Sequence, residues 1–174
     1  TDLSAPNFHA PVEAFVAGLG GARRTCVVAI CKCPYKCPPL PFEVAFLLDE
    51  LARRRGARGA LEIVVTCPVP WPFGGPKAAE AFKAAMAAKG IAFRPNVRVT
   101  GVGAAGGRKV VSLSSTAEGG GPCDGVEADL VLAVYPHRAP TFVPASLLNA
   151  KGSAPVDFRT NALAGRDGTE YCVG

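Results

Sequence analysis

The sequence has 174 residues, of which 49% are hydrophobic and 19% are charged, and its net charge at pH 7 is +5. These values predict one globular domain with an ordinary core, and they exclude a disordered chain. Nothing in the charge indicates a nucleic-acid partner, because the one dense basic run, Arg53–Arg55 with Arg58, is predicted to be a solvated helix end. No apolar run reaches the roughly 18–20 residues of a membrane span.

The first half of the chain alternates helices and strands. Residues 12–19 predict a short helix, and residues 25–30 (TCVVAI) form the continuous apolar run of a buried parallel strand. Apolar residues then recur at helical spacing from about 42 to 55. A second buried strand is predicted over 61–66 (LEIVVT), and an alanine-rich helix over 77–90.

The second half is predicted to be β-rich. Strands are expected within 91–102, 108–115 and 128–136, and the glycine-rich segment 117–125 (AEGGGPCDG) is predicted to be a flexible turn. The order β-α-β-α followed by a short β run is typical of one half of a doubly wound dinucleotide-binding fold with a β-meander attached. The sequence therefore predicts an α/β, Rossmann-like domain.

One glycine motif does not predict a cofactor site. Residues 101–106 (GVGAAG) match the pattern G-x-G-x-x-G, but that pattern binds a pyrophosphate only where it opens a helix. Here a predicted strand follows, so the motif is interpreted as a hairpin turn.

The first strand-to-helix corner, residues 31–42 (CKCPYKCPPLPF), contains no glycine. The second strand ends in Thr66-Cys67-Pro68 and has no acidic residue to hold a ribose. A nicotinamide-binding domain needs both features, so NAD is predicted not to bind.

Cys37 lies in this corner just ahead of a predicted helix, with Lys36 beside it. Helix N-termini and neighbouring cations favour thiolate over thiol, which suits a reactive cysteine. The alternative is that Cys37 is a buried packing residue in a turn shaped by prolines. The residues alone support the two interpretations equally.

The other cysteines do not have the spacing of a disulfide framework. Cys26 and Cys67 are predicted to be small core residues, while Cys123 is placed in a turn and Cys172 in a strand. A closed zinc site requires four ligands, and the C-x-C-x₃-C cluster at 31–37 has only three cysteines. No metal site is therefore predicted.

Four segments resemble flavoproteins of the sulfide:quinone oxidoreductase and flavocytochrome c sulfide dehydrogenase group, within the pyridine nucleotide–disulfide oxidoreductase superfamily. They are PYKCPPLPFEVAFLLDELARRRG, EIVVTCPVPWPFGGPKAAEAFKAAMAAKGIAF, ADLVLAVYPHRAP and PVDFRTNALAGRDGTEYCVG. The resemblance runs from Val12 to Gly174, and PYKCPP (34–39) is its most specific element. The chain begins with Thr1 rather than methionine, and we expect it to be a piece of a longer protein.

The resemblance implies an FAD-dependent oxidoreductase in which residues 25–136 form a second nucleotide-type domain that does not serve NAD. Residues 1–24 and 137–174 would belong to the FAD domain. Cys37 would be one of two redox cysteines that oxidise sulfide through a persulfide and pass electrons by way of the flavin to a quinone or a cytochrome. The second cysteine would lie beyond Gly174.

The resemblance also places cofactor-binding residues. Lys36 and Pro38 flank the redox cysteine, His137 lies on a loop near the flavin or quinone, and Gly174 ends a segment that closes the flavin site. A surface hinge is an equal alternative for His137. The intact protein would associate with a membrane surface, whereas this piece alone would hold FAD poorly. The alternative functions are an NAD(P)H:quinone-type flavoprotein and a non-catalytic domain that keeps the fold.

Overall fold

The computed structural model describes residues 7–71 and 74–172. It divides the chain into two compact units, Thr1–Pro136 and His137–Gly174. No helix among the described residues is long and apolar enough to cross a membrane.

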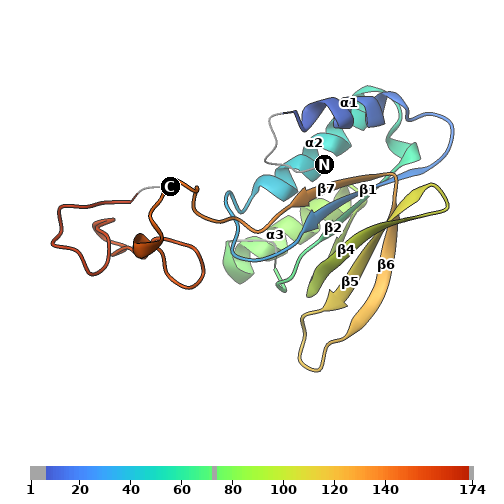
Figure 1. Ribbon diagram of the computed structural model, residues 1–174. Coiled ribbons are helices and arrows are strands. Elements are labelled where there is room, and N and C mark those ends of the chain that lie inside the picture. Colours follow the sequence, from blue (N-terminus) through green and yellow to red (C-terminus); the bar gives the residue numbers. More distant parts are fainter. Residues whose placement is uncertain (1–6, 72–73, 173–174) are drawn as a thin grey trace. The chain divides into compact units, whose positions relative to one another are not determined.

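The first unit is built on a four-stranded parallel sheet (Figure 1). Its strands, in spatial order, are β3 (Ile91–Arg94), β2 (Leu61–Thr66), β1 (Arg24–Ile30) and β7 (Leu130–Val134). The chain leaves β1 toward β2 on one side and returns to β7 on the other, so the strand order reverses at β1. Such a switch point is where open α/β sheets bind their ligands.

One face of this sheet packs against helices. They are α1 (His9–Ala17), α2 (Leu40–Arg54) and α3 (Gly75–Ala88), with a short 3₁₀ turn, η1 (Arg58–Ala60), after α2. Alternate residues of each strand supply the sheet's side of this core, as the two-residue period of a strand requires. Phe42 of α2 is fully buried there, in edge-to-face contact with Phe82 and Phe93.

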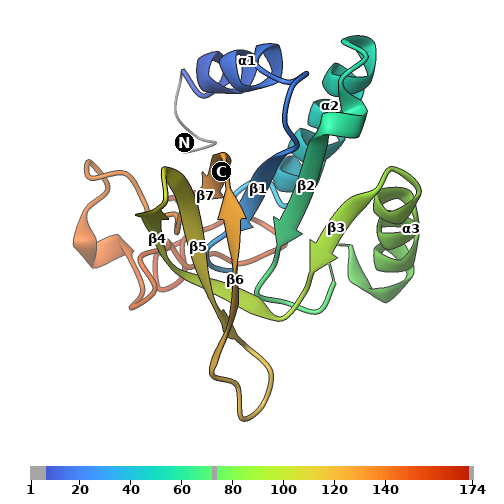
Figure 2. The same cartoon turned by 90° about the vertical axis from the view of Figure 1, so that its right-hand side faces the viewer.

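The other face of the sheet packs against a three-stranded antiparallel meander (Figure 2). Its strands are β4 (Val97–Ala105), β5 (Arg108–Ser115) and β6 (Pro122–Ala128). Val27 and Val64 of the parallel sheet lie in this second core with Val111 and Leu113 of the meander. Because both faces are covered, β1, β2 and β7 are mostly buried and apolar, and the layered arrangement confirms the predicted α/β fold.

The motif GVGAAG lies in β4 and the turn to β5, so its interpretation as part of a hairpin is correct. The prediction of a flexible turn over 117–125 is wrong in its second half, because β6 begins at Pro122. Local glycine content favoured a turn, but β5 pairs with this segment and places Cys123 opposite Leu113. The pairing is tertiary and overrides the local signal.

The basic run at the end of α2 is not simply solvated, as the sequence suggested. Asp49 is fully buried and accepts hydrogen bonds from Arg53 Nε (2.8 Å), Lys89 Nζ (3.1 Å) and Arg58 Nε. Arg58 also donates to the carbonyl oxygen of Leu61 at 2.6 Å, and its side chain is only 19% exposed. The guanidinium therefore ties the end of α2 to the start of β2.

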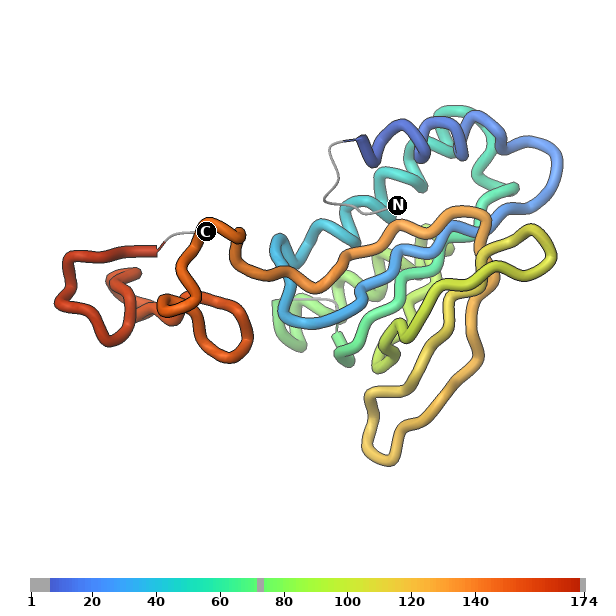
Figure 3. The backbone as a smooth tube through the Cα atoms, viewed as in Figure 1, coloured from blue at the N-terminus to red at the C-terminus, as the bar shows by residue number. Residues whose placement is uncertain are grey.

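The second unit, His137–Gly174, is made mostly of turns around the short 3₁₀ helix η2 (Ala145–Leu147) (Figure 3). The Asp157 carboxylate closes one turn by accepting hydrogen bonds from Arg159 N (2.9 Å) and Thr160 N (2.9 Å). The strand predicted around Cys172 is wrong. Tyr171 forms only an isolated bridge with Ala162, and Cys172 is exposed.

Candidate functional site

The candidate site lies at the carboxyl edge of the parallel sheet, where β1 and β2 end side by side. Ala29 pairs with Thr66 in the parallel register, so the segments that follow the two strands leave the sheet at the same level. The segment after β1 is the first corner, residues 31–39, and the segment after β2 begins at Cys67. The topology therefore brings cysteines from both segments to one edge.

The first corner ends in a helix start whose amide donors are already used. Leu40 N donates to Cys37 O at 2.9 Å, and Phe42 N donates to Pro39 O at 3.0 Å. Pro39 is the N-cap and Pro41 lies in the first turn, and neither has an N–H group. A phosphate at a helix N-terminus is held by free amide groups, so this helix start does not form a phosphate cradle of that kind.

Cys37 is exposed at this helix start, and its φ is +51°. A left-handed backbone is uncommon for a residue with a side chain and costs about 1–2 kcal/mol, so the fold holds this thiol in place against local strain. Beside it, the Tyr35 hydroxyl donates to Pro38 O at 2.8 Å and closes the loop. The interpretation of Cys37 as a buried packing residue is wrong.

The same edge holds a pair of thiols that the sequence did not indicate. Cys33 is half-buried and packs against the helix-side core that contains Cys67, and the two thiols are near enough to shift each other's pKa. Cys67 is fully buried, so its prediction as a core residue is correct, but it also has a thiol neighbour. Its position after β2 was visible in the sequence, whereas its contact with the corner after β1 depends on the sheet register.

Tyr35 lies among these thiols. Burial raises the pKa of its phenol, and the nearby thiols of Cys67, Cys33 and Cys37 raise it further. Burial also raises the pKa of Cys33, against the opposing effect of the hydrogen bond from Cys67. The pKa of Cys67 is raised to about 11, mainly by burial and despite a hydrogen bond from the backbone of Val69.

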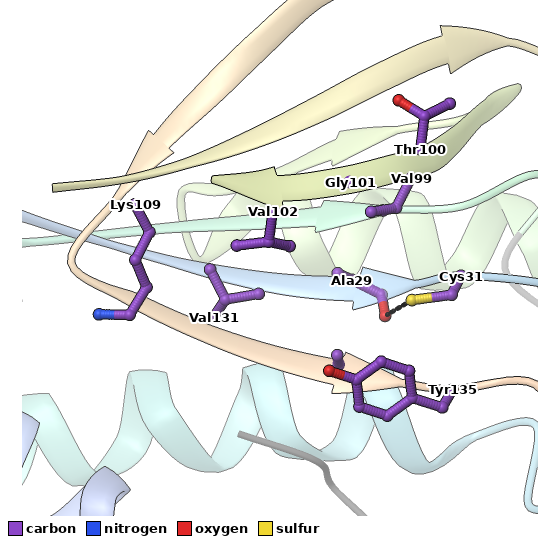
Figure 4. A pocket seen from close by; sticks show the side chains of 10 residues that line it. Ala29, Cys31, Val99, Thr100, Gly101, Val102, Lys109, Val131 and Tyr135 are labelled. Atoms are coloured by element: carbon purple, nitrogen blue, oxygen red, sulfur yellow. Dashed lines mark hydrogen bonds between the residues drawn. The ribbon is translucent and has the colours of Figure 1, made fainter. Parts of the chain in front are cut away.

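A cleft of about 450 Å³ lies between the parallel sheet and β4 (Figure 4). Its walls are mostly apolar, with Lys109 near one end and Cys31 and Tyr135 near the other. The Cys31 thiol donates to Ala29 O at 3.8 Å, and Lys109 Nζ donates to Asp129 O at 2.9 Å. Cys37 is not among the residues that line this cleft, so the corner and the cleft are separate features.

The structure brings together only some of the residues predicted for a cofactor. Lys36 and Pro38 are exposed beside Cys37. His137 is half-buried in the second unit, and Gly174 lies outside the described residues. The residues that the structure describes contain no group of three or more histidine, cysteine or acidic side chains placed to hold a metal.

No protein-family model matches the sequence, and no curated protein matches it. The fold is similar to that of solved oxidoreductases. The sulfide:quinone oxidoreductase of the hyperthermophilic bacterium Aquifex aeolicus is 16% identical, with a TM-score of 0.69 over 90% of this chain and 35% of that chain. LpdA from Mycobacterium tuberculosis is 15% identical, with a TM-score of 0.55 over 84% of this chain and 28% of that one.

A pyridine nucleotide-disulfide family oxidoreductase from Enterococcus faecalis V583 is 12% identical, with a TM-score of 0.54, covering 81% of this chain and 29% of that one. The chain thus spans about a third of the length of these proteins. At such low identity the likeness establishes the fold, which is that of a nucleotide-binding-type domain of oxidoreductases.

Proposed function

We propose that this chain is the central part of an FAD-dependent oxidoreductase that oxidises sulfide at Cys37 and passes the electrons by way of the flavin to a quinone or a cytochrome. Residues 25–136 would be its second nucleotide-type domain. Residues 1–24 would lead in from the FAD domain, and residues 137–174 would return to it. The observation that carries this proposal is the exposed Cys37 thiol at the switch point of a dinucleotide-type fold.

The corner supports a thiol function better than a nucleotide function. The amide groups of Leu40 and Phe42 are engaged within the corner, and Pro39 and Pro41 have none to offer. A nicotinamide dinucleotide would need such groups for its pyrophosphate. The corner instead holds a sulfur nucleophile in a strained, exposed position, with the cation of Lys36 next to it.

The resemblance of PYKCPP (34–39) to sulfide-oxidising flavoproteins specifies the reaction. Cys37 would begin in a disulfide with a second cysteine beyond Gly174. Sulfide attacks this disulfide, the S–S bond breaks, and one cysteine becomes a persulfide while the other leaves as a thiolate. The role of Cys37 is to present its sulfur to the flavin, and Lys36 lies next to it in the sequence.

The residues present fit a flavin that binds against the corner from outside the first unit, because the Cys37 thiol is exposed there. Lys36 and Pro38 are also exposed and would form the rim of that contact. FAD, when bound, supplies the two-electron acceptor that sulfide oxidation requires. His137 and Gly174 would contribute from the returning segment.

The test is an anaerobic titration of the intact flavoprotein with sulfide, following the loss of the flavin's visible absorbance. We expect sulfide to bleach the flavin, and we expect Cys37→Ser to slow this reduction by several orders of magnitude, because the sulfur that exchanges with the substrate is gone. Cys123→Ser, in the meander strand β6, is the matched control and should leave the rate unchanged.

Three results would contradict the proposal. Full bleaching in Cys37→Ser would remove the role of the cysteine. Rapid flavin reduction by NADH, with no reaction with sulfide, would favour an NAD(P)H:quinone-type flavoprotein. A Cys37 that forms no persulfide with sulfide, and whose thiol stays unreactive toward alkylating reagents after the protein is reduced, would favour a non-catalytic domain.

A further inference from the structure

One valine of the meander faces the parallel sheet without being covered by it. Val102 of β4 pairs with Val111 of β5, and residues directly opposite each other in an antiparallel pair lie on the same face. Val111 is fully buried in the core between the two sheets, so Val102 also faces the parallel sheet. Val102 is nevertheless 51% exposed. The two layers therefore part at this residue.

A bulge in β4 gives Val102 this orientation. Val99 pairs with Leu113, and the register shifts between Val99 and Gly101, so that Thr100 is left out of the pairing. Without the extra residue, the two-residue period of a strand would place Gly101 on the inward face in place of Val102. Figure 4 shows Val102 directed toward the parallel sheet and Thr100 directed away from it.

The parallel sheet presents small side chains opposite this gap. Val27, Val64 and Val131 are neighbours in one row across the sheet, and all three lie in the core beneath the meander. Two residues further along the strands, the same face carries Ala29 and Ala133, which are also neighbours. Methyl groups reach less far than valine side chains, so the space between the layers opens into the cleft of about 450 Å³ that these alanines line.

The cleft has a cation at one end and an aromatic ring at the other (Figure 4). Lys109 Nζ donates to the carbonyl oxygen of Asp129, but within the described ranges no carboxylate forms an ion pair with Lys109. The Asp129 carboxylate is paired with Arg108 instead, at 3.2 Å. An ammonium group carries three donors, so Lys109 can also donate to a ligand. At the other end, Tyr135 is 52% exposed.

The shape of the cleft specifies an elongated ligand. Val131, Ala133 and Tyr135 line it along one edge, and these positions span about 13 Å at the rise of a β-strand. An extended chain of about ten carbons has this length, with C–C bonds of about 1.5 Å at tetrahedral angles. The volume is typical of a small-molecule site with apolar walls. The single cation at one end complements an anionic head group.

We propose that this cleft binds a medium-chain carboxylate, with its head group at Lys109 and its alkyl chain running between β4 and β7 to Tyr135. Binding would cover the exposed faces of Val102 and Tyr135, which is the source of affinity for the chain. The site does not include Cys37 and requires neither sulfide nor a flavin. It therefore does not rest on the proposed function.

The test is a calorimetric titration of the intact protein with sodium decanoate below its micelle concentration. We expect one site per chain, and we expect affinity to rise about threefold to fourfold for each methylene from hexanoate to decanoate. The rise should stop once the chain exceeds the length of the cleft. Decanol, which has the same chain without the charge, should bind about two- to fivefold more weakly than decanoate, as the loss of one exposed ion pair predicts.

Two variants separate the head-group contact from the cleft itself. Lys109→Met keeps an unbranched side chain without the charge, and it should lower the affinity for decanoate to that for decanol while leaving decanol unchanged. Lys77→Met, at an exposed lysine of α3 on the helix-covered face, is the matched control and should change neither. Ala133→Leu extends a side chain into the cleft and should weaken both ligands more than tenfold. Urea denaturation of this variant verifies that it is folded.

Photo-crosslinking maps the site. A decanoate analogue with a diazirine in mid-chain should label tryptic peptides 99–108 and 110–138, which contain Val102 and Tyr135 respectively. Label confined to other peptides would overturn the proposal. So would binding of decanoate that is unchanged in both Lys109→Met and Ala133→Leu, an affinity for decanol equal to that for decanoate, or association only with phospholipid vesicles and not with monomeric decanoate.

Discussion

The two ends of helix α2 use polar chemistry in opposite ways. At its carboxyl end, buried Asp49 accepts hydrogen bonds from Arg53, Arg58 and Lys89, and these ion pairs stabilise the fold. At its amino end, prolines and internal hydrogen bonds occupy the backbone, and Cys37 is left exposed on a left-handed residue. The fold gains nothing evident from that thiol.

The difference separates residues that stabilise this domain from residues available for chemistry. The network at Asp49 satisfies a buried carboxylate with three cations, which is what a buried charge requires in order to be tolerated. The strain at Cys37 is the reverse: a local backbone cost at a residue whose side chain is exposed. Such strain is commonly found at functional sites. Measuring stability and reactivity separately at each end of α2 tests this difference.

The largest expected effect on stability is at the carboxyl end. Asp49→Asn removes the carboxylate that accepts from Arg53, Arg58 and Lys89, and it leaves Arg58, which is 19% exposed, without this charge partner. We expect a loss of about 3 kcal/mol in the free energy of unfolding, measured by urea denaturation. Arg54→Ala is the control. Its pair with Glu50 is solvent-exposed, so its loss should cost under about 0.5 kcal/mol. Equal costs for the two variants would show that the buried network is not stabilising.

Acid should affect the same cluster in a predictable direction. Burial alone would raise the pKa of Asp49, but the hydrogen bonds from Arg53, Arg58 and Lys89 outweigh burial and lower it from 3.8 to about 2. A carboxylate whose pKa is lower in the folded state stabilises the protein above its unfolded pKa. We therefore expect stability to fall as the pH drops from about 4 toward 2, and this part of the pH profile to be absent in Asp49→Asn. A profile that is the same in both proteins would contradict this assignment.

The fold was largely predictable from the sequence, because β1, β2 and β7 are mostly buried on both faces and therefore contain long apolar runs. The strand predicted at 61–66 coincides with β2, and the predicted helices lie within a few residues of α2 and α3. Strand β6 was missed because its residues Pro122 to Gly125 have turn propensity, and only pairing with β5 makes them a strand. Asp49 was not identified as the partner of Arg58, because the amphipathic pattern of its helix gives no sign of a buried carboxylate.

The candidate site was predictable in part. Cys37 could be singled out, because prolines and a helix start surround it in the sequence. The placement of Cys33 on the same side of the sheet as Cys67 could not be predicted, since it depends on the parallel register of β1 with β2 and on the side toward which the corner turns. The cleft near Cys31 and Tyr135 was also invisible, because β4 reaches it from a distant part of the chain.

The smallest expected effect tests the amino end of α2, where backbone strain and thiol reactivity meet at one residue. Cys37→Ala keeps a side chain at φ +51°, whereas Cys37→Gly removes the Cβ that makes this conformation unfavourable. Both variants lose the thiol, so the difference between them reports backbone strain at this position, offset in part by the larger conformational entropy of glycine in the unfolded chain. We expect the glycine variant to be more stable than the alanine variant by about 1 kcal/mol in urea denaturation. If the glycine variant unfolded at a lower urea concentration than the alanine variant, as it would at an unstrained position, the contrast between the two ends of α2 would rest only on the exposure of the thiol.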